Sequence, residues 1–232
     1  MIGIYGGTFN PIHVGHLRAA EEVVETLDLD RMVFIPSARP PHKLDEADET
    51  APARLRLEWV ELAIRDNPRF AADPIEVDRP GPSFLVDTLR ALRDGNPGEE
   101  LTFVVGQDAF SEMGGWREPR EIFRLAHVAV TTRPPVLDGS LADWLPACVA
   151  QDFEMGDGGQ TARHREAGTR IRRIAVTPLD VSASEIRRRL RSGRSIRYLV
   201  PEIVRTAIIA SGAYSAASPV QRSTGRASSG ES

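Results

Sequence analysis

Residues 2–27 read IGIYGGTFNPIHVGHLRAAEEVVETL. The apolar residues 2–5 are too few for a helix and end at paired glycines, whereas residues 17–27 carry apolar side chains at helical spacing beside three glutamates. This pattern predicts a strand, a glycine-rich turn and a helix. Residues 32–35 then predict a second buried strand before a proline, so the chain opens with a β-α-β unit, whose parallel strands need the crossover helix.

Helix and strand patterns continue to alternate along the chain, which is typical of a parallel sheet covered by helices. The predicted helices cover residues 52–66 and 83–93, and the predicted strands cover residues 75–77, 101–105 and 127–131. Glycine, proline and charge interrupt any period over roughly residues 134–170, which we interpret as excursion loops with short elements. A strand at residues 174–176 follows, then a helix near Ser184 and a terminal helix from Pro201.

The predicted fold class is a single Rossmann-like α/β domain, with a parallel sheet covered by helices on both faces and a helical C-terminal end. This domain is expected to span residues 1–215. Residues 216–232 are rich in Ser, Gly and Ala and carry almost no large apolar side chains. They cannot offset their ordering entropy, so we expect a mobile tail.

The composition excludes several classes of protein. A chain of 232 residues with 41% hydrophobic content can bury a proper core. Its net charge of -4 argues against a protein that coats nucleic acid, so we expect small-molecule partners. The lone Cys148 cannot form an internal disulfide, and neither a signal peptide nor a membrane span is predicted, so we expect a cytoplasmic location.

The glycine-rich turn carries the first chemical signal. It follows a strand of a parallel sheet, where ligands bind, and Gly6, Gly7 and Gly15 let a nucleotide approach the backbone while the helix start offers N–H groups to phosphate. His13 and His16 are three residues apart and can share one helical face, which suits one phosphate or one metal. Zinc would need a third protein ligand, which no nearby residue supplies, so the pattern favours phosphate and predicts no metal site.

This turn resembles that of the HxGH nucleotidyltransferase superfamily, in which His-x-Gly-His binds and activates a nucleoside triphosphate. The turn contains neither a GxxxxGK[ST] loop nor a GxGxxG fingerprint, which would indicate other nucleotide chemistry. The resemblance implies that His16 stabilises the charge developing on the α-phosphate and that His13 assists. It also implies that Thr8 and Phe9 line the ATP site.

A second segment, Val181-Ser182-Ala183-Ser184-Glu185-Ile186-Arg187, matches the superfamily's second motif position by position. Ser184 and Arg187 alone would equally fit a helix cap followed by a surface arginine. The resemblance implies that Ser182, Ser184, the helix start through Ile186 and the Arg187 side chain hold the β- and γ-phosphates.

The tripeptide Gly106-Gln107-Asp108 follows the predicted strand 101–105 and therefore also lies at the ligand edge of the sheet. Related families place Gly-x-Asp against the ATP ribose or the metal, which implies ATP contacts for Gly106 and Asp108. Without that context the tripeptide is an ordinary turn, since Gly and Asp favour turns by themselves.

Further segments resemble the nicotinate-nucleotide adenylyltransferases, and the matches reach from Met1 to about Tyr214. In Pro40-Pro41-His42-Lys43, the prolines stiffen a loop whose His-Lys tip can meet phosphates, although a basic loop can equally be solvated surface. Residues 81–89, GPSFLVDTL, resemble the family's Pro-Ser-Tyr-Thr-x-Asp-Thr-Leu, with Ser83 expected to cap the helix. Phe84 and Leu85 replace Tyr and Thr, so only backbone contacts to nicotinate carry over.

The family stacks a tryptophan on the pyridine ring at the position that Gly114-Gly115-Trp116-Arg117 occupies here. A tryptophan packed in the core is the alternative for Trp116. The acceptor-binding residues implied by the resemblance are Asn10, His42, Lys43, Phe84, Leu85, Trp116 and Arg117. The catalytic residues implied by it are His13, His16, Lys43 and Arg187.

The resemblance implies a reaction in which the phosphate of nicotinate mononucleotide attacks the α-phosphorus of ATP. The products are nicotinate adenine dinucleotide and pyrophosphate, a step of NAD biosynthesis, and Mg²⁺ is expected to enter with the ATP phosphates. One alternative is phosphopantetheine adenylyltransferase, which usually has Thr at the position of His13. Another is a noncatalytic nucleotide sensor, which could have discarded His13, His16 and Arg187. The sequence leaves a homo-oligomer open and indicates no nucleic-acid or membrane partner.

Overall fold

The computed structural model describes residues 1–39, 50–132 and 139–214, and its strands form one sheet in the order β3-β2-β1-β4-β5-β8-β7-β6. The strands are β1 (Ile2–Gly7), β2 (Arg31–Pro36), β3 (Phe70–Ala72), β4 (Leu101–Gly106), β5 (His127–Thr132), β6 (Phe153–Gly156), β7 (Thr161–His164) and β8 (Arg170–Ala175). The helices are α1 (Val14–Leu27), α2 (Ala53–Ile64), α3 (Ile75–Asp78), α4 (Leu85–Gly95), α5 (Gln107–Glu112), α6 (Pro119–Leu125), α7 (Leu141–Trp144), α8 (Ala183–Arg191) and α9 (Glu202–Ser211).

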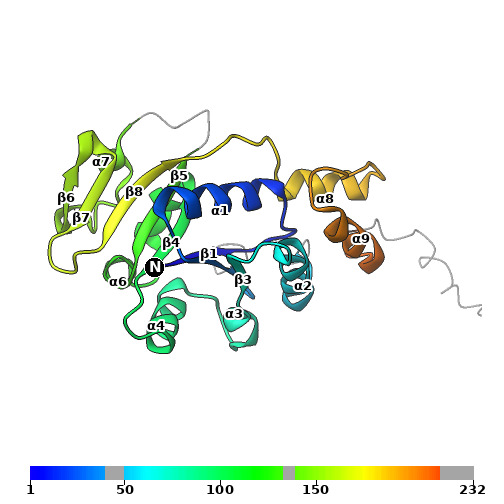
Figure 1. The fold of residues 1–232 in the computed structure, drawn as a ribbon, viewed down its shortest axis with the longest axis horizontal. Helices are drawn as coiled ribbons and strands as arrows, with labels where there is room; N and C mark the ends of the chain where they lie inside the picture. Colours follow the sequence, from blue (N-terminus) through cyan, green and yellow to red (C-terminus); the bar gives the residue numbers. More distant parts are fainter. Residues whose placement is uncertain (40–49, 133–138, 215–232) are drawn as a thin grey trace, which may run out of the picture.

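Six neighbouring strands, from β3 to β8 in the sheet order, pair in parallel. The central strands β1, β2, β4 and β5 are buried and read as apolar runs, because helices cover both faces of the sheet. One core cluster joins the sheet to α1, α2, α8 and α9, and a second joins it to α4, α5, α6 and α7. Figure 1 shows α1 and α4 on opposite sides of the sheet. The predicted Rossmann-like architecture with a helical C-terminal end is confirmed.

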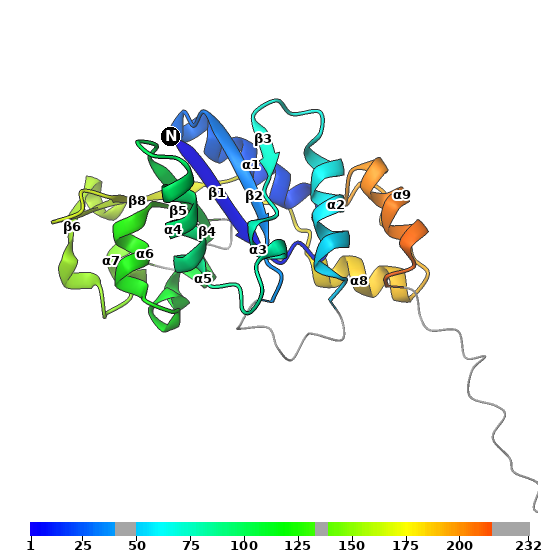
Figure 2. The ribbon, with the colours of Figure 1, turned by 90° about the horizontal axis from the view of Figure 1, so that it is seen from below.

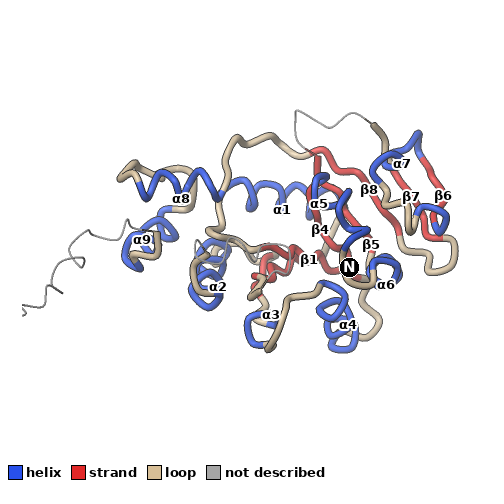
Figure 3. Tube along the Cα trace, turned by 180° about the vertical axis from the view of Figure 1, so that it is seen from behind, coloured by secondary structure: helices blue, strands red, loops and turns tan. Residues whose placement is uncertain are grey.

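The sheet is not wholly parallel, which corrects the prediction. Within the stretch predicted as excursion loops, α7 forms, and β6 and β7 pair in antiparallel fashion with each other, while β7 pairs in the same way with β8. Figure 3 shows these two strands continuing the sheet beyond β8. The last parallel strand, β8, also begins at Arg170, earlier than the predicted residues 174–176.

The strand predicted at residues 75–77 is wrong, since these residues form helix α3. Pro74 precedes this helix, and the Asp73 carboxylate accepts a hydrogen bond from the N–H of Ile75 at 2.9 Å, which favours a helical turn. The strand of this region is instead β3, whose Phe70 pairs with Met32 of β2.

The start of α4 also differs from the prediction. Phe84, and not Ser83, occupies the N-cap position. The Ser83 hydroxyl instead accepts hydrogen bonds from the N–H groups of Ala38 at 3.0 Å and Arg39 at 3.2 Å, which ties the segment after β2 to the segment before α4.

The C-terminal helix packs beside α2, as Figure 2 shows. It begins after Pro201, as predicted, and ends at Ser211 in a left-handed Gly212. No helix in the described part of the chain is both long and apolar enough to cross a membrane. The predicted tail, residues 216–232, lies outside the described residues.

Candidate active site

The candidate site lies where the strand order reverses, at the carboxyl ends of the adjacent strands β1 and β4. Open parallel sheets bind ligands at this switch point. Two cavities flank it. The larger cavity, of about 470 Å³, has Tyr5 and Gly106 in its lining, and the smaller cavity, of about 330 Å³, has Gly6 and Phe103.

The larger cavity brings together residues from three of the predicted motifs. The predicted ATP-binding residues in its lining are His13, Gly15, His16, Gly106, Asp108 and Ser182. Sequence reasoning missed other residues of this lining, among them Tyr5, Thr131, Thr177 and Leu179, and it gave no role to Val181, the first residue of the second motif. The four residues without a motif come from β1, β5 and the segment before α8, so only the folded chain brings them together.

The two histidines are held in one arrangement at the start of α1. His13 is the N-cap, is 6% exposed, and its ring stacks on that of His16 with centroids 3.7 Å apart. The backbone N–H of His13 donates to Nδ1 of His16 at 3.2 Å. In the neutral imidazole the proton of His16 then resides on Nε2, which makes that nitrogen the donor. Phe9 packs edge-on against the same ring, with centroids 5.2 Å apart.

Gly15 allows α1 to approach the segment before α8. A Cβ at this position would lie 2.9 Å from Cγ1 of Val181 and 3.1 Å from Nδ1 of His13. Because Val181 is buried and branched at Cβ, it has little room to move. The glycine is therefore required by close packing beside the larger cavity.

The second motif is divided between the cavity and the core. The Ser182 hydroxyl caps α8 by accepting from the N–H of Glu185 at 3.2 Å, and Ser182 lines the larger cavity. Ser184, Ile186 and Arg187 line neither cavity. Ile186 is buried in the core, and Arg187, 7% exposed, donates from Nη1 to the carbonyl of Asn10 at 3.0 Å. Arg187 thus connects α8 to the glycine-rich turn.

The turn itself is anchored from behind. Asn10 is 4% exposed and lines neither cavity, because its Oδ1 accepts from the N–H of Ala51 at 3.0 Å and from the hydroxyl of Tyr214. Burial raises the pKa of Tyr214, so the phenol remains a donor. Phe9, with φ of 45°, is packed in the core. The predicted ligand contacts of Asn10 and Phe9 therefore have no cavity surface in this structure.

The smaller cavity is lined by aromatic and polar side chains near the start of α4. The predicted residues in its lining are Gly6, Gly7, Thr8, Phe84, Leu85, Trp116 and Arg117. Trp116 is half-buried and packs edge-on against Phe103 with ring centroids 6.2 Å apart, so it is not a fully buried core residue. Gly6, Gly7 and Thr8, which the sequence analysis assigns to ATP, line this smaller cavity and not the larger one. His42 and Lys43 lie outside the described residues.

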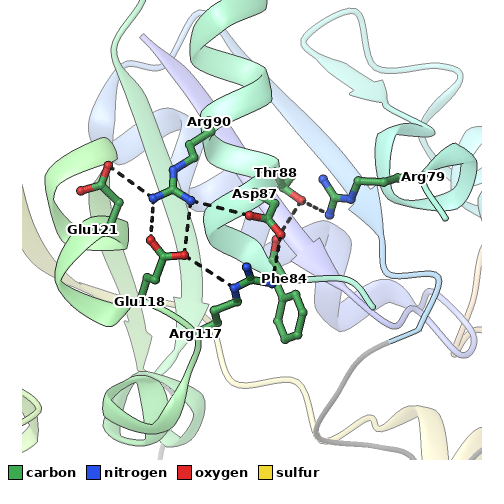
Figure 4. A network of polar contacts seen from close by, with 8 residues as sticks. All are labelled: Arg79, Phe84, Asp87, Thr88, Arg90, Arg117, Glu118 and Glu121. Atoms are coloured by element: carbon green, nitrogen blue, oxygen red, sulfur yellow. Dashed lines mark hydrogen bonds and ion pairs between the residues drawn. The ribbon is translucent and has the colours of Figure 1, made fainter. Parts of the chain in front are cut away.

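A network of charges holds one wall of the smaller cavity (Figure 4). The guanidinium of Arg117 lies over the ring of Phe84, 4.8 Å from its centroid. Asp87 lies 3.8 Å from Arg117 and Glu118 lies 3.6 Å from it, while Glu118 also pairs with Arg90 of α4 at 2.6 Å. The network joins α4 to the start of α6, so the Phe84 and Arg117 side chains are held together.

Sequence reasoning also missed two buried charged residues. Glu76 of α3 lines the smaller cavity and accepts from the hydroxyl of Thr88 at 2.7 Å. Arg56 of α2 is 1% exposed and donates to backbone carbonyl groups around the turn. Neither residue belongs to a motif, and a charged residue on a helix is usually exposed.

An α/β sheet with a histidine pair, two helix starts and two cavities at its switch point defines a nucleotide-binding fold of the Rossmann-like class. The sequence model of the cytidylyltransferase-like family matches residues 4–189, more than half of the chain. The chain belongs to that family, and within it to the nicotinate-nucleotide adenylyltransferases, on the sequence identities that follow.

Two bacterial relatives bear the name probable nicotinate-nucleotide adenylyltransferase. The protein of Geobacter metallireducens is 46% identical over 202 residues, which are 87% of this chain and 92% of that protein. The protein of Trichlorobacter lovleyi is 44% identical over 213 residues, which are 92% of this chain and 98% of that protein. Among solved structures, the Plasmodium falciparum nicotinic acid mononucleotide adenylyltransferase complexed with NaAD has a TM-score of 0.69. It covers 92% of this chain and 96% of its own at 15% identity, which supports the fold alone.

Proposed function

We propose that this chain joins ATP and nicotinate mononucleotide to give nicotinate adenine dinucleotide and pyrophosphate. One observation carries the proposal: two cavities of different chemistry meet at the glycine-rich turn. The larger one combines the histidine pair with the start of α8, which suits a triphosphate. The smaller one combines Trp116, Phe84 and Phe103, which suits a flat pyridine ring.

In this proposal ATP occupies the larger cavity and the acceptor nucleotide occupies the smaller one. The acceptor phosphate then lies near Gly6 and Gly7, between the two cavities, and can approach the α-phosphorus of ATP in line. Holding two reactants in such an arrangement can lower the barrier by about 7–11 kcal/mol. No enzyme nucleophile is needed, because the acceptor's own phosphate oxygen attacks and pyrophosphate leaves.

The residues contribute positive charge and hydrogen-bond donors. The Nε2–H of His16 is assigned to the α-phosphate, and the N-terminus of α8, capped by Ser182, is assigned to the outer phosphates. Lys43 and His42 remain proposed phosphate ligands by resemblance. Arg187 acts through the carbonyl of Asn10, to which it donates, and it fixes the glycine-rich turn rather than touching phosphate.

Magnesium fits this site through its preference for carboxylate and phosphate oxygens. Asp108 lines the larger cavity, and Mg²⁺ is commonly held by one or two carboxylates together with substrate phosphates. When bound, the ion neutralises charge on the triphosphate. Asp108 would hold it, directly or through water, beside the ribose and phosphates of ATP.

The test is pyrophosphate release by the full chain with ATP, Mg²⁺ and a panel of acceptors. Nicotinate mononucleotide, nicotinamide mononucleotide and phosphopantetheine separate the proposed activity from its nearest relatives. If phosphopantetheine is the one acceptor of the panel that releases pyrophosphate, the proposal is wrong. If the chain binds ATP but turns over none of the acceptors, it is a nucleotide sensor. We further propose that the enzyme is cytoplasmic. The exposed Cys148 forms no disulfide, which is typical of proteins in a reducing compartment.

A further inference from the structure

Arg56 is a buried cation that is bound by carbonyl groups rather than by carboxylates. Its side chain is 1% exposed. Among the described residues it makes no ion pair with Asp or Glu, and burial lowers its pKa to about 10. Burying a charge without a counter-ion is costly. A buried arginine in this position therefore indicates a task that an apolar side chain cannot perform.

Arg56 donates hydrogen bonds to three backbone carbonyl groups, which indicate its role. Its Nε donates to Ala51 at 2.8 Å, just before α2. Its Nη2 donates to Ser37 at 2.7 Å, just after β2, and its Nη1 donates to Thr8 in the glycine-rich turn. A guanidinium presents its donors in one rigid plane, so a single side chain fixes the relative positions of three segments.

Two of these three acceptors, Thr8 and Ser37, line the smaller cavity, whereas none of them lines the larger cavity. The backbone N–H of Ser37 also donates to the carbonyl of Gly7 at 2.9 Å. The segment after Ser37 continues to Ala38 and Arg39, which donate to Ser83 beside Phe84. Arg56 thus does not line the smaller cavity itself, but it is hydrogen-bonded to two residues that do.

We propose that Arg56 is a positioning residue for the acceptor nucleotide. It holds the glycine-rich turn and the end of β2 at the separation that the acceptor requires, without touching either substrate. This inference rests on the proposed function, since that proposal assigns the smaller cavity to the acceptor. A displacement of about 1 Å in such a site can cost on the order of 100-fold in rate.

The experiment measures kcat and KM separately for nicotinate mononucleotide and for ATP in the full-length variants Arg56→Lys and Arg56→Gln. Lysine keeps a charge but cannot reach three carbonyl groups at once. We expect kcat/KM for the acceptor to fall at least about tenfold in Arg56→Lys and further in Arg56→Gln, while KM for ATP changes less than about threefold.

Two matched controls lie on the same helix. Arg54 is exposed and pairs with Asp78, so Arg54→Gln should leave both KM values unchanged. Val60 is fully buried, so Val60→Ala should lower the melting temperature without moving the wall of the smaller cavity. All assays are run at a temperature where circular dichroism shows each variant folded.

A purely structural role for Arg56 gives different results. The proposal is wrong if Arg56→Lys and Val60→Ala lower the melting temperature by the same amount and also lower kcat/KM for the acceptor by the same factor. It is also wrong if Arg56→Lys raises KM for ATP as much as KM for the acceptor. Failure of Arg56→Gln to fold leaves the Arg56→Lys comparison decisive. A wild-type chain that uses another phosphomonoester overturns the proposed function, and the same comparison then uses that acceptor.

Discussion

The hydrogen bond from the His13 backbone N–H to Nδ1 of His16 leaves Nε2 as the ring nitrogen of His16 that can donate to a substrate. A histidine with Nδ1 already engaged presents Nε2 as its donor, and the stacked ring of His13 with the edge of Phe9 limits rotation. A donor fixed before the substrate arrives costs no reorganisation during the reaction. The effect of His16 should therefore appear mainly in turnover rather than in folding.

We predict that His16→Ala lowers kcat by at least tenfold while ATP affinity and melting temperature change little. Loss of a transition-state donor typically costs about 2.7–4 kcal/mol, and a tenfold loss corresponds to about 1.4 kcal/mol. Steady-state kinetics and calorimetric ATP binding measure the two quantities. His127→Ala, at the opposite end of the sheet, is the matched histidine control. A decrease in kcat of less than tenfold would remove His16 from the proposed mechanism.

The smaller cavity predicts discrimination between acid and amide acceptors. The N–H of Leu85 at the first position of α4 has no partner within that helix, and the Arg117 guanidinium lies over Phe84 nearby. A carboxylate accepts charge-assisted bonds from such donors, whereas an amide turns an NH₂ group toward one of them at a cost of about 1–3 kcal/mol. We expect kcat/KM to favour nicotinate mononucleotide over nicotinamide mononucleotide by at least about tenfold.

The same measurement on Trp116→Ala should show weaker use of both acceptors, because stacking on the ring contributes about 0.5–1.5 kcal/mol whichever substituent it carries. Trp59→Phe, in the core beside Tyr214, is the control for a general effect of tryptophan replacement. Equal kcat/KM for acid and amide in the wild type would refute this pocket while leaving adenylyl transfer intact.

Residues with a local signature could be predicted from the sequence, and residues defined by distant contacts could not. His13, His16 and Ser182 stand in short motifs beside a turn or a cap, and all three line the larger cavity. Arg56 stands two residues from the exposed Arg54 on the same helix, and no local pattern separates them. Arg56 is held in the interior by the carbonyl groups of Thr8 and Ser37, which lie 48 and 19 residues before it in the sequence.

Among the elements, the contact of α1 with the segment before α8 leads to a prediction about Gly15. Gly15→Ala places a methyl group against Val181 and His13, and overpacking of this kind costs about 1–3 kcal/mol. We expect both lower stability in urea and lower kcat, since His13 must move. Gly95→Ala is the matched control, because that glycine ends α4 with open space around it and should change stability by about 1 kcal/mol or less. Equal effects of the two substitutions would contradict the packing argument.

The elements that the sequence predicted well are the long or fully buried ones. α1 shows a clear helical period, β1, β2 and β4 are short apolar runs, and the bounds of all four differ from the predicted ones by a few residues. The short α3 was mistaken for a strand because Ile75 and Val77 alternate around Glu76, whereas the preceding Pro74 and Asp73 favour a helical turn. The hairpin β6–β7 was missed because each strand has four residues, too few to establish a period.

For the whole molecule, the packing of Tyr214 leads to a prediction about truncation at the C-terminal side. Tyr214 is buried, donates to Asn10 and packs against Trp59 with ring centroids 5.7 Å apart. We predict that deleting residues 216–232 changes neither melting temperature nor activity, since their composition offers almost no core-forming side chains.

Deleting residues 213–232 removes Tyr214 as well and should destabilise the protein by about 2 kcal/mol or more, which lowers the melting temperature by several degrees. Differential scanning calorimetry of the two truncated chains measures the contrast. A loss of several degrees in the shorter deletion would show that the tail docks on the domain.

The two cavities meet at β1 and yet share no lining residue, since Tyr5 belongs to one and the adjacent Gly6 to the other. Substitutions in the lining of one cavity therefore leave the lining residues of the other cavity unchanged. A gene library randomised at Phe84, Leu85 and Trp116 would sample new phosphate-bearing acceptors while the cavity proposed for ATP stays unchanged. The glycine-rich turn contributes residues to both cavities, so substitutions in it would change both at once.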